Sequence, residues 1–189
     1  MAEEQKKPQS EPQMQEKLLK TRSILLSGEI NKESADEIIK QLLVLEGESD
    51  DPIKLYINSP GGDVDAGYAI FDMVRFISAP VTMVGMGLVA SAAVLVLLAV
   101  PAERRVALPN STYLIHQLMS GMRGVVTDIE IHAQYLERLR AKLDALIASE
   151  TGKSVEEVAS DTDRDHWLTS DEALTYGLVS RIVTERSAL

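Results

Sequence analysis

The chain contains no cysteine, and only 4% of its residues are aromatic. The absence of cysteine excludes a disulfide framework, thiolate zinc sites, iron–sulfur clusters and a cysteine nucleophile, and it leaves the redox compartment undetermined. Any covalent chemistry would therefore fall to a serine, a threonine or a carboxylate. Basic residues are also few, since 19 Lys and Arg stand against 29 Asp and Glu for a net charge of −10. This balance, without any basic run, argues against nucleic acid or an anionic membrane as a partner.

A length of 189 residues, with 45% hydrophobic and 25% charged residues, is typical of one globular domain. The first 16 residues contain no aromatic or β-branched residue, so they offer too little apolar surface to offset the entropy of ordering. We therefore expect a mobile polar leader over 1–17 and a single domain over 18–189. The leader lacks the apolar stretch of a secretory signal and is too acidic for a transit peptide, which favours a cytoplasmic location by default.

Residues 79–102 carry no charge, and a stretch of that length raises the question of a transmembrane helix. Prolines near both ends and glycines at Gly85 and Gly87 divide it. We expect a short strand over 81–84, a glycine turn, and an apolar helix of about a dozen residues, a length typical of a buried core helix. The sequence therefore predicts no membrane span.

Strand and helix patterns alternate along the rest of the chain, which predicts an α/β fold of βα units. The expected helices and strands lie at 33–45, 54–58, 63–77 and 113–116. A capping box from Thr169 to Glu172 predicts the start of a short helix that ends at Gly177.

The longest periodic segment runs over 127–149, with a capping box from Thr127 to Glu130 at its start and Gly152 at its end. At ~1.5 Å per residue this helix would reach about 35 Å, longer than one small domain requires. Two interpretations are open: its single apolar stripe packs on its own domain, or the helix is a handle that projects to a partner subunit.

Ser91 is the one polar side chain in the apolar run MGLVASAAV. One interpretation is a small helical serine that hydrogen-bonds back to its own backbone. The other is a nucleophile at a helix start, where adjacent backbone N–H groups favour a developing oxyanion. The G-x-S-x-G elbow of the α/β-hydrolases is absent, so that particular fold is not supported.

His116 ends a strand pattern, where it could be a core histidine or the general base for a serine. Asp165 lies in the charged stretch DTDRDH; it is either a solvated loop acid or the carboxylate that orients a catalytic histidine. His132 and His166 are rival bases, but neither lies at a strand end facing the glycine turn. No HExxH or comparable spacing predicts a metal site.

Gly61 and Gly62 follow a strand, but no Lys-Ser or Lys-Thr comes after them as in a phosphate-binding loop. Asp63 and Asp65 would also repel a phosphate. A turn whose backbone N–H groups approach a substrate is the better interpretation.

Six stretches, taken together and in order, resemble the proteolytic-subunit family of the ATP-dependent Clp protease (ClpP), which has the crotonase-like fold. They are YINSPGGDVDAGYAIFD, GMGLVAS, RRVALPNS, IHQ, TDIEIHA and DTDRDHWLTSDEALTYGL, and the similarity runs from about residue 18 to 182. The separations of 25 residues from Ser91 to His116 and 49 from His116 to Asp165 agree with the family's triad. The resemblance implies an α/β fold of repeated βα units in which the long helix is an oligomerisation handle.

The resemblance implies a serine endopeptidase with Ser91 as nucleophile, His116 as general base and Asp165 as the residue that orients it. The family's oxyanion hole corresponds to the backbone N–H groups of Gly62 and Ala92. Peptide would lie extended between the strand after Gly62 and the segment 118–126, pairing through its main chain. No cofactor and no metal are implied.

The implied assembly is two stacked seven-membered rings that enclose the active sites, with unfolded polypeptides delivered by a AAA+ unfoldase. In the family an arginine at the position of Arg164 pairs with an acid of the opposite ring. The chain departs from the family at Ala92 and Ala93, where Met-Gly is usual, and at Leu118, where proline is usual. The family usually has an apolar hairpin at its N-terminus, whereas the leader of this chain is polar.

Two other functions are open besides that of an active protease. The first is a catalytically idle or regulatory ring subunit that needs a paralogous partner. The second is a crotonase acting on acyl-CoA, for which the fold would serve but a Ser-His-Asp set has no role in hydration or isomerisation.

Overall fold

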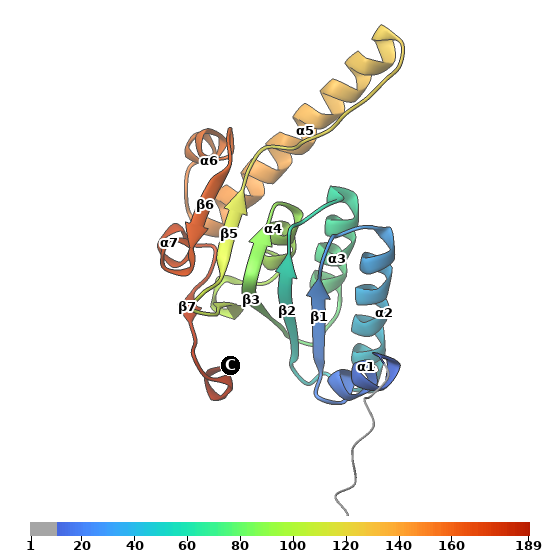
Figure 1. Cartoon of the computed structure of the whole chain (residues 1–189), viewed down its shortest axis with the longest axis vertical. Helices are drawn as coiled ribbons and strands as arrows, with labels where there is room; N and C mark the ends of the chain where they lie inside the picture. Colours follow the sequence, from blue (N-terminus) through green and yellow to red (C-terminus); the bar gives the residue numbers. More distant parts are fainter. Residues whose placement is uncertain (1–10) are drawn as a thin grey trace, which may run out of the picture.

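A computed structural model describes residues 11–189, in which helices lie around a seven-stranded, mostly parallel sheet (Figure 1). The strands are β1 (Ser23–Ser27), β2 (Ile53–Ser59), β3 (Val81–Ala90), β4 (Arg105–Ala107), β5 (Thr112–Ile115), β6 (His166–Thr169) and β7 (Arg181–Ile182). The helices are α1 (Glu11–Lys20), α2 (Lys32–Glu48), α3 (Val64–Phe76), α4 (Ala92–Leu97), α5 (Val126–Thr151), α6 (Val155–Asp161) and α7 (Ser170–Tyr176), with 3-10 turns η1 (Ala102–Arg104) and η2 (Arg186–Ala188). The predicted α/β class is confirmed.

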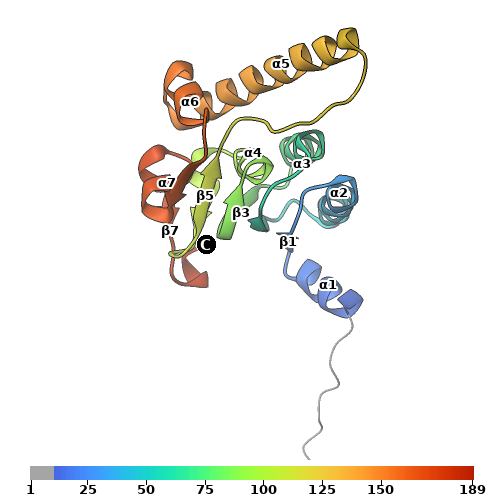
Figure 2. The same cartoon turned by 45° about the horizontal axis from the view of Figure 1, so that its top comes forward.

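The strand order is β1-β2-β3-β4-β7, and β5 leaves this path to pair with both β3 and β6. All strand pairs are parallel except β5 with β6. The helices α2, α3 and α4 lie side by side along the sheet (Figure 2) and bury their apolar faces against it. In parallel pairs the carboxyl ends of the strands meet at one edge, so residues that follow β2, β3 and β5 come together there.

The predicted glycine turn at Gly85 and Gly87 is wrong, because β3 continues through both residues. A Cβ on Gly85 would lie 2.4 Å from the Tyr113 hydroxyl oxygen, and one on Gly87, where φ is +57°, would lie 2.5 Å from Asn58 Oδ1. These close approaches require glycine inside the strand. The first half of β3 pairs with β4 and the second half with β5, so the strand redirects the sheet at this point. The apolar helix that follows, α4, has only 6 residues, all buried.

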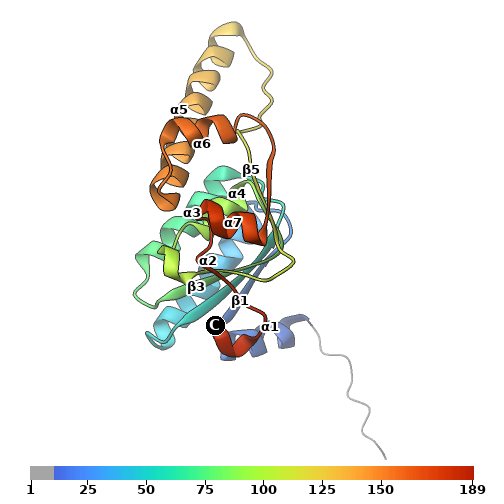
Figure 3. The ribbon, with the colours of Figure 1, turned by 90° about the vertical axis from the view of Figure 1, so that its left-hand side faces the viewer.

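The long helix α5 projects from the body of the molecule (Figures 1 and 3). It spans 26 residues, and its buried residues, Asp144, Ile147 and Ala148, all lie in its C-terminal half. The N-terminal half therefore projects from the domain, while the C-terminal half packs on it; contact of the projecting half with a partner subunit stays a prediction. The predicted Thr127 capping box is wrong, because the helix already starts at Val126 and its N-cap residue makes no side-chain cap.

The predicted start and end of α7 are confirmed by a reciprocal capping box between Thr169 and Glu172 and by a left-handed Gly177. The left-handed Gly152 likewise ends α5 as predicted. Within 11–189 no helix is both long and apolar enough to cross a bilayer.

The leader differs in part from expectation, since residues 11–17 lie in α1 rather than in an irregular segment. The exposed pair between Glu16 and Lys20, four residues apart, favours this helix, and Leu19 packs on the core. The rest of the predicted leader, residues 1–10, lies outside the described residues. The boundary between leader and domain stays a prediction.

Candidate active site

Ser91 occupies the sharp turn that joins β3 to α4. Its backbone has φ 55° and ψ −122°, a conformation that non-glycine residues rarely adopt and that costs about 1–3 kcal/mol. The Ser91 N–H donates a hydrogen bond of 2.9 Å to the Leu114 carbonyl, which fixes the turn to β5. The side chain remains partly exposed. The turn thus holds a hydroxyl at the sheet edge in a strained backbone geometry.

His116 follows the last residue of β5 and lies beside Ser91. The parallel pairing of β3 with β5 sets Ala90 opposite Leu114, so both strands end at the same edge. Ser91 and His116 line the same two pockets, one beneath the serine and one open to the segment 60–62. Among the described residues no hydrogen bond joins the two side chains. The structure therefore brings the predicted nucleophile and base to one cleft without yet linking them.

Asp165 comes immediately before β6, at the same edge of the sheet. Antiparallel pairing sets His166 opposite Ile115, which puts Asp165 next to the chain that carries His116. The Asp165 side chain is exposed, and within residues 11–189 it forms no hydrogen bond or ion pair with His116. The backbone thus places the carboxylate near the histidine, while the orienting contact itself is absent in this conformation.

Of the glycine pair after β2, Gly61 packs against the Ser91 turn and Gly62 against Ile30. At Gly61, where φ is +88°, an added Cβ would lie 2.8 Å from Ser91 Cβ and 2.9 Å from the Ala92 nitrogen. At Gly62, where φ is +144°, it would lie 2.2 Å from the Ile30 carbonyl oxygen. In the part of the chain that the structure describes, the N–H groups of Gly62 and Ala92 donate no hydrogen bond. Both predicted oxyanion donors are therefore available beside Ser91.

The segment after Gly62 is not a strand, which corrects the expectation drawn from the resemblance. Asp63 caps the N-terminus of α3 by accepting a hydrogen bond of 2.7 Å from the Ala66 N–H, so the helix begins at once. Only a single bridge from Gly62 to Ile30 has strand geometry here.

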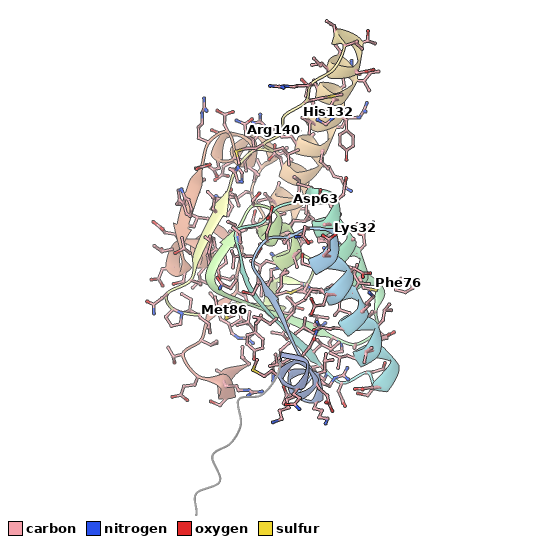
Figure 4. The ribbon with its side chains drawn as sticks, turned by 45° about the vertical axis from the view of Figure 1, so that its right-hand side comes forward. Lys32, Asp63, Phe76, Met86, His132 and Arg140 are labelled. Carbon is pink, nitrogen blue, oxygen red and sulfur yellow. The ribbon has the colours of Figure 1, made fainter. Side chains whose placement is uncertain are left out.

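An apolar hollow with a cavity volume of about 40 Å³ lies beneath Ser91, between α4 and the C-terminal half of α5. Its apolar lining comes from Val64, Ala92, Val94, Leu95, Leu98, Ile115, Leu118, Leu143, Leu146 and Ile147. Arg140 and Asp144, both in the C-terminal half of α5, also line it, and Arg140 is labelled in Figure 4. Sequence analysis missed both charged residues. Their spacing of four on one helix face was the available signal.

The rival histidines lie elsewhere. His132 projects from the outer half of α5 (Figure 4), 3.0 Å from the Ser120 hydroxyl, and His166 lies 3.9 Å from Asp161. Neither lines a pocket with Ser91. No cluster of potential metal ligands occurs within residues 11–189. Arg164 is 91% exposed, with Asp163 at 4.0 Å as its ion-pair partner.

Comparison with known proteins gives consistent matches along nearly the whole chain. Residues 5–186 match the family model described as Clp protease. The chain is 61% identical over 175 residues to the ATP-dependent Clp protease proteolytic subunit 2 of Treponema pallidum, covering 92% of this chain and 88% of that protein. It is 48% identical over 170 residues to the proteolytic subunit 3 of Rhizobium etli, covering 90% and 88%. A point mutant of ClpP1 from Listeria monocytogenes superposes with a TM-score of 0.86 at 46% identity, covering 92% and 98%.

Proposed function

The chain belongs to the Clp protease family, whose proteolytic subunits are serine-type peptidases, and from that premise we propose that Ser91, His116 and Asp165 perform its peptide hydrolysis. The observation that carries the assignment is the strained Ser91 turn, which shares a cleft with His116 and with two N–H groups that make no other hydrogen bond.

In the proposed mechanism His116 takes the proton of the Ser91 hydroxyl as the oxygen attacks the scissile carbonyl. The N–H groups of Gly62 and Ala92 stabilise the oxyanion, a contribution of about 10²–10³ in rate for each donor. His116 then protonates the leaving amine, and water releases the acyl group by the same steps. Asp165 holds the imidazole and stabilises its charged form.

Self-association belongs to the same proposal. The outer part of α5 and the segment before it expose the large apolar side chains Met119, Met122, Val125, Val126, Ile129, Ile131 and Tyr135. Such a surface favours burial against another subunit. We place it between two stacked seven-membered rings, with Arg164 pairing to an acid of the opposite ring. Assembly would then order the loop that carries Asp165.

Family membership extends the proposal to substrate and partner. Unfolded polypeptides would bind extended along the cleft, between 60–62 and 118–126, with main-chain hydrogen bonds that read little sequence. The hollow beneath Ser91 would take the side chain at the cleavage site. A AAA+ unfoldase would deliver these chains, and a cytoplasmic location fits the family.

A second candidate is a ring subunit that is idle until a paralogous subunit joins it. Two observations favour it: Asp165 forms no hydrogen bond or ion pair with His116 within residues 11–189, and the relatives from Treponema pallidum and Rhizobium etli are named proteolytic subunit 2 and 3.

The deciding experiment combines a fluorophosphonate probe, a fluorogenic peptide and sedimentation velocity on the purified chain. We expect labelling at Ser91, and Ser91→Ala should lower peptide cleavage by about 10⁵–10⁶-fold while the sedimentation coefficient is unchanged. Equal labelling of Ser91→Ala would reject the nucleophile. An assembled chain that is inactive until a paralogue is added would support the second candidate.

A further inference from the structure

One arginine, in the C-terminal half of α5, connects that helix to the two segments that carry His116 and Asp165. From α5, Arg140 donates from Nη1 to Gln117 Oε1 at 3.2 Å and from Nη2 to Asp163 Oδ1 at 3.4 Å. Nη2 also reaches the Ala159 carbonyl at 3.5 Å, and Nε lies 3.8 Å from Asp144 Oδ2. Gln117 directly follows the proposed base, and Asp163 comes two residues before the proposed orienting acid.

The two segments are also bonded to each other around this arginine. Gln117 donates its backbone N–H to the Thr162 carbonyl at 2.5 Å and its side-chain amide to the Asp163 carbonyl at 2.6 Å. Thr162 donates its hydroxyl to Asp144 Oδ1 at 2.9 Å. Arg140 closes this ring, because among the described residues of α5 it alone forms hydrogen bonds with both Gln117 and Asp163.

The surroundings make the arginine hard to replace. Asp144 is only 5% exposed and Thr162 1% exposed, so this end of the network lies out of water, where hydrogen bonds to charged groups are stronger. The side chains of Arg140 and Asp163 are 33% and 57% exposed, so the contact between them faces the solvent. The planar guanidinium presents several donors in a fixed arrangement, whereas the ammonium of lysine is a point charge on a flexible stem. A lysine could stay near Asp144, but it could not serve Gln117 and Asp163 at the same time.

We propose that Arg140 is a positioning residue for catalysis: its forked contacts set the distance between His116 and Asp165 and couple that distance to the position of α5. The inference rests on the proposed triad. It predicts that displacement of α5 reaches the catalytic histidine through Gln117 and Asp163, without any contact between Arg140 and the reacting atoms.

The first measurement is the pH profile of kcat/KM for a fluorogenic peptide. In Arg140→Ala we expect kcat to fall at least tenfold and the acidic limb of the profile to move to lower pH, because Asp165 would no longer reach His116 to stabilise its protonated form in the proposed mechanism. The charged residues that share a pocket with His116 are Glu29, Arg140 and Asp144. If Arg140 acted only through its positive charge, its removal would favour protonated His116 and would move the acidic limb of the profile to higher pH. A shift in that direction therefore overturns the positioning role.

Arg140→Lys retains the positive charge but removes the several hydrogen-bond donors of the guanidinium, so it separates the effect of those hydrogen bonds from the effect of the charge. We expect it to lose activity as well, with the same direction of pH shift, and a wild-type kcat would overturn the claim. It also keeps the test decisive if Arg140→Ala fails to fold. The matched control is Arg138→Ala, two residues earlier on α5, since Arg138 is exposed and takes part in no hydrogen bond or ion pair of the described residues. It should keep the wild-type kcat and profile.

The second measurement is a double mutant. If Arg140 acts through Asp165, Arg140→Ala combined with Asp165→Ala should be no slower than Asp165→Ala alone. Losses that multiply would overturn the inference. A nearly inactive Asp165→Ala beside a fully active Arg140→Ala would reject only the role of Arg140. A fully active Asp165→Ala would instead reject the proposed triad, and the inference with it.

Discussion

Replacing Gly61 with alanine should damage catalysis as well as the stability of the fold. Gly61 has φ +88°, and an alanine in the left-handed region costs about 1–2 kcal/mol. Its Cβ would lie 2.5 Å from the Ala90 carbonyl oxygen, 2.8 Å from Ser91 Cβ and 2.9 Å from the Ala92 nitrogen. Because atoms pack at about 3.5–4.0 Å, the Ser91 turn or the glycine segment must move by about 0.5–1 Å.

That movement separates the groups that the reaction requires. The Ser91 turn carries the proposed nucleophile and one oxyanion donor, and the glycine segment carries the other donor at Gly62. A misplacement of about 1 Å lowers an enzymatic rate about 10²-fold, which corresponds to about 2.7 kcal/mol of transition-state stabilisation. We therefore expect kcat/KM of Gly61→Ala to fall about 10²-fold.

Gly152→Ala is the matched control, because Gly152 has φ +77° and a Cβ there would meet nothing within 4 Å. In chemical unfolding at equal protein concentration, Gly152→Ala should lose about 1–2 kcal/mol from its left-handed φ alone. Gly61→Ala should lose about 1–3 kcal/mol more because its Cβ overlaps backbone atoms, and only Gly61→Ala should lose peptidase activity. If Gly61→Ala kept its kcat/KM within threefold of wild type, the close packing of the glycine segment on the nucleophile turn would not matter for catalysis.

Three further outcomes follow from burial and charge. Glu150→Ala should lower the free energy of unfolding by about 3–5 kcal/mol, because the guanidinium of Arg105, which is 1% exposed, loses its carboxylate partner. The control Lys40→Ala breaks an exposed ion pair and should change the free energy of unfolding little. Equal losses in the two variants would contradict the argument. Burial raises the pKa of Tyr113 to about 12, whereas the pKa of a tyrosine in the unfolded chain is about 10. The free energy of unfolding should therefore fall as the pH rises from about 10 to 12. Chemical unfolding of Tyr113→Phe should show a smaller fall over the same pH range. We propose that the domain starts near residue 18, so deletion of 1–17 should leave the thermal midpoint nearly unchanged, and a fall of several degrees would show that this segment packs.

The parts of the fold that local patterns determine could be predicted from the sequence. The strand β2 and the helix α3 match their expected ranges within one or two residues, because their apolar periodicity and flanking turn residues agree. The ends of α7 could be predicted because a capping box and a C-terminal glycine act within a few residues. Ser91 could be named as a candidate because it is the one polar side chain in an apolar run, and His116 because it lies where a strand pattern stops.

The errors came from contacts between distant segments. Gly85 and Gly87 look like turn residues, but their partners Tyr113 and Asn58 require glycine inside a strand. Asp165 is one acid in a charged loop, and only the family resemblance distinguished it from its neighbours. The role we infer for Arg140 depends on contacts between α5 and the segments that contain Gln117 and Asp163. No local sequence pattern predicts these contacts.

The cleft is defined by where strands end, and this has a consequence for the evolution of related enzymes. Ser91, His116 and Asp165 each lie one residue beyond a strand end, so the pairing of β3, β5 and β6 fixes their places. The chain between them has exposed stretches outside the proposed subunit interface, such as 101–104. Insertions or deletions there would alter the interval between the reacting residues without moving the strands. Natural variation in length should therefore accumulate at these stretches, while strand register is preserved by selection.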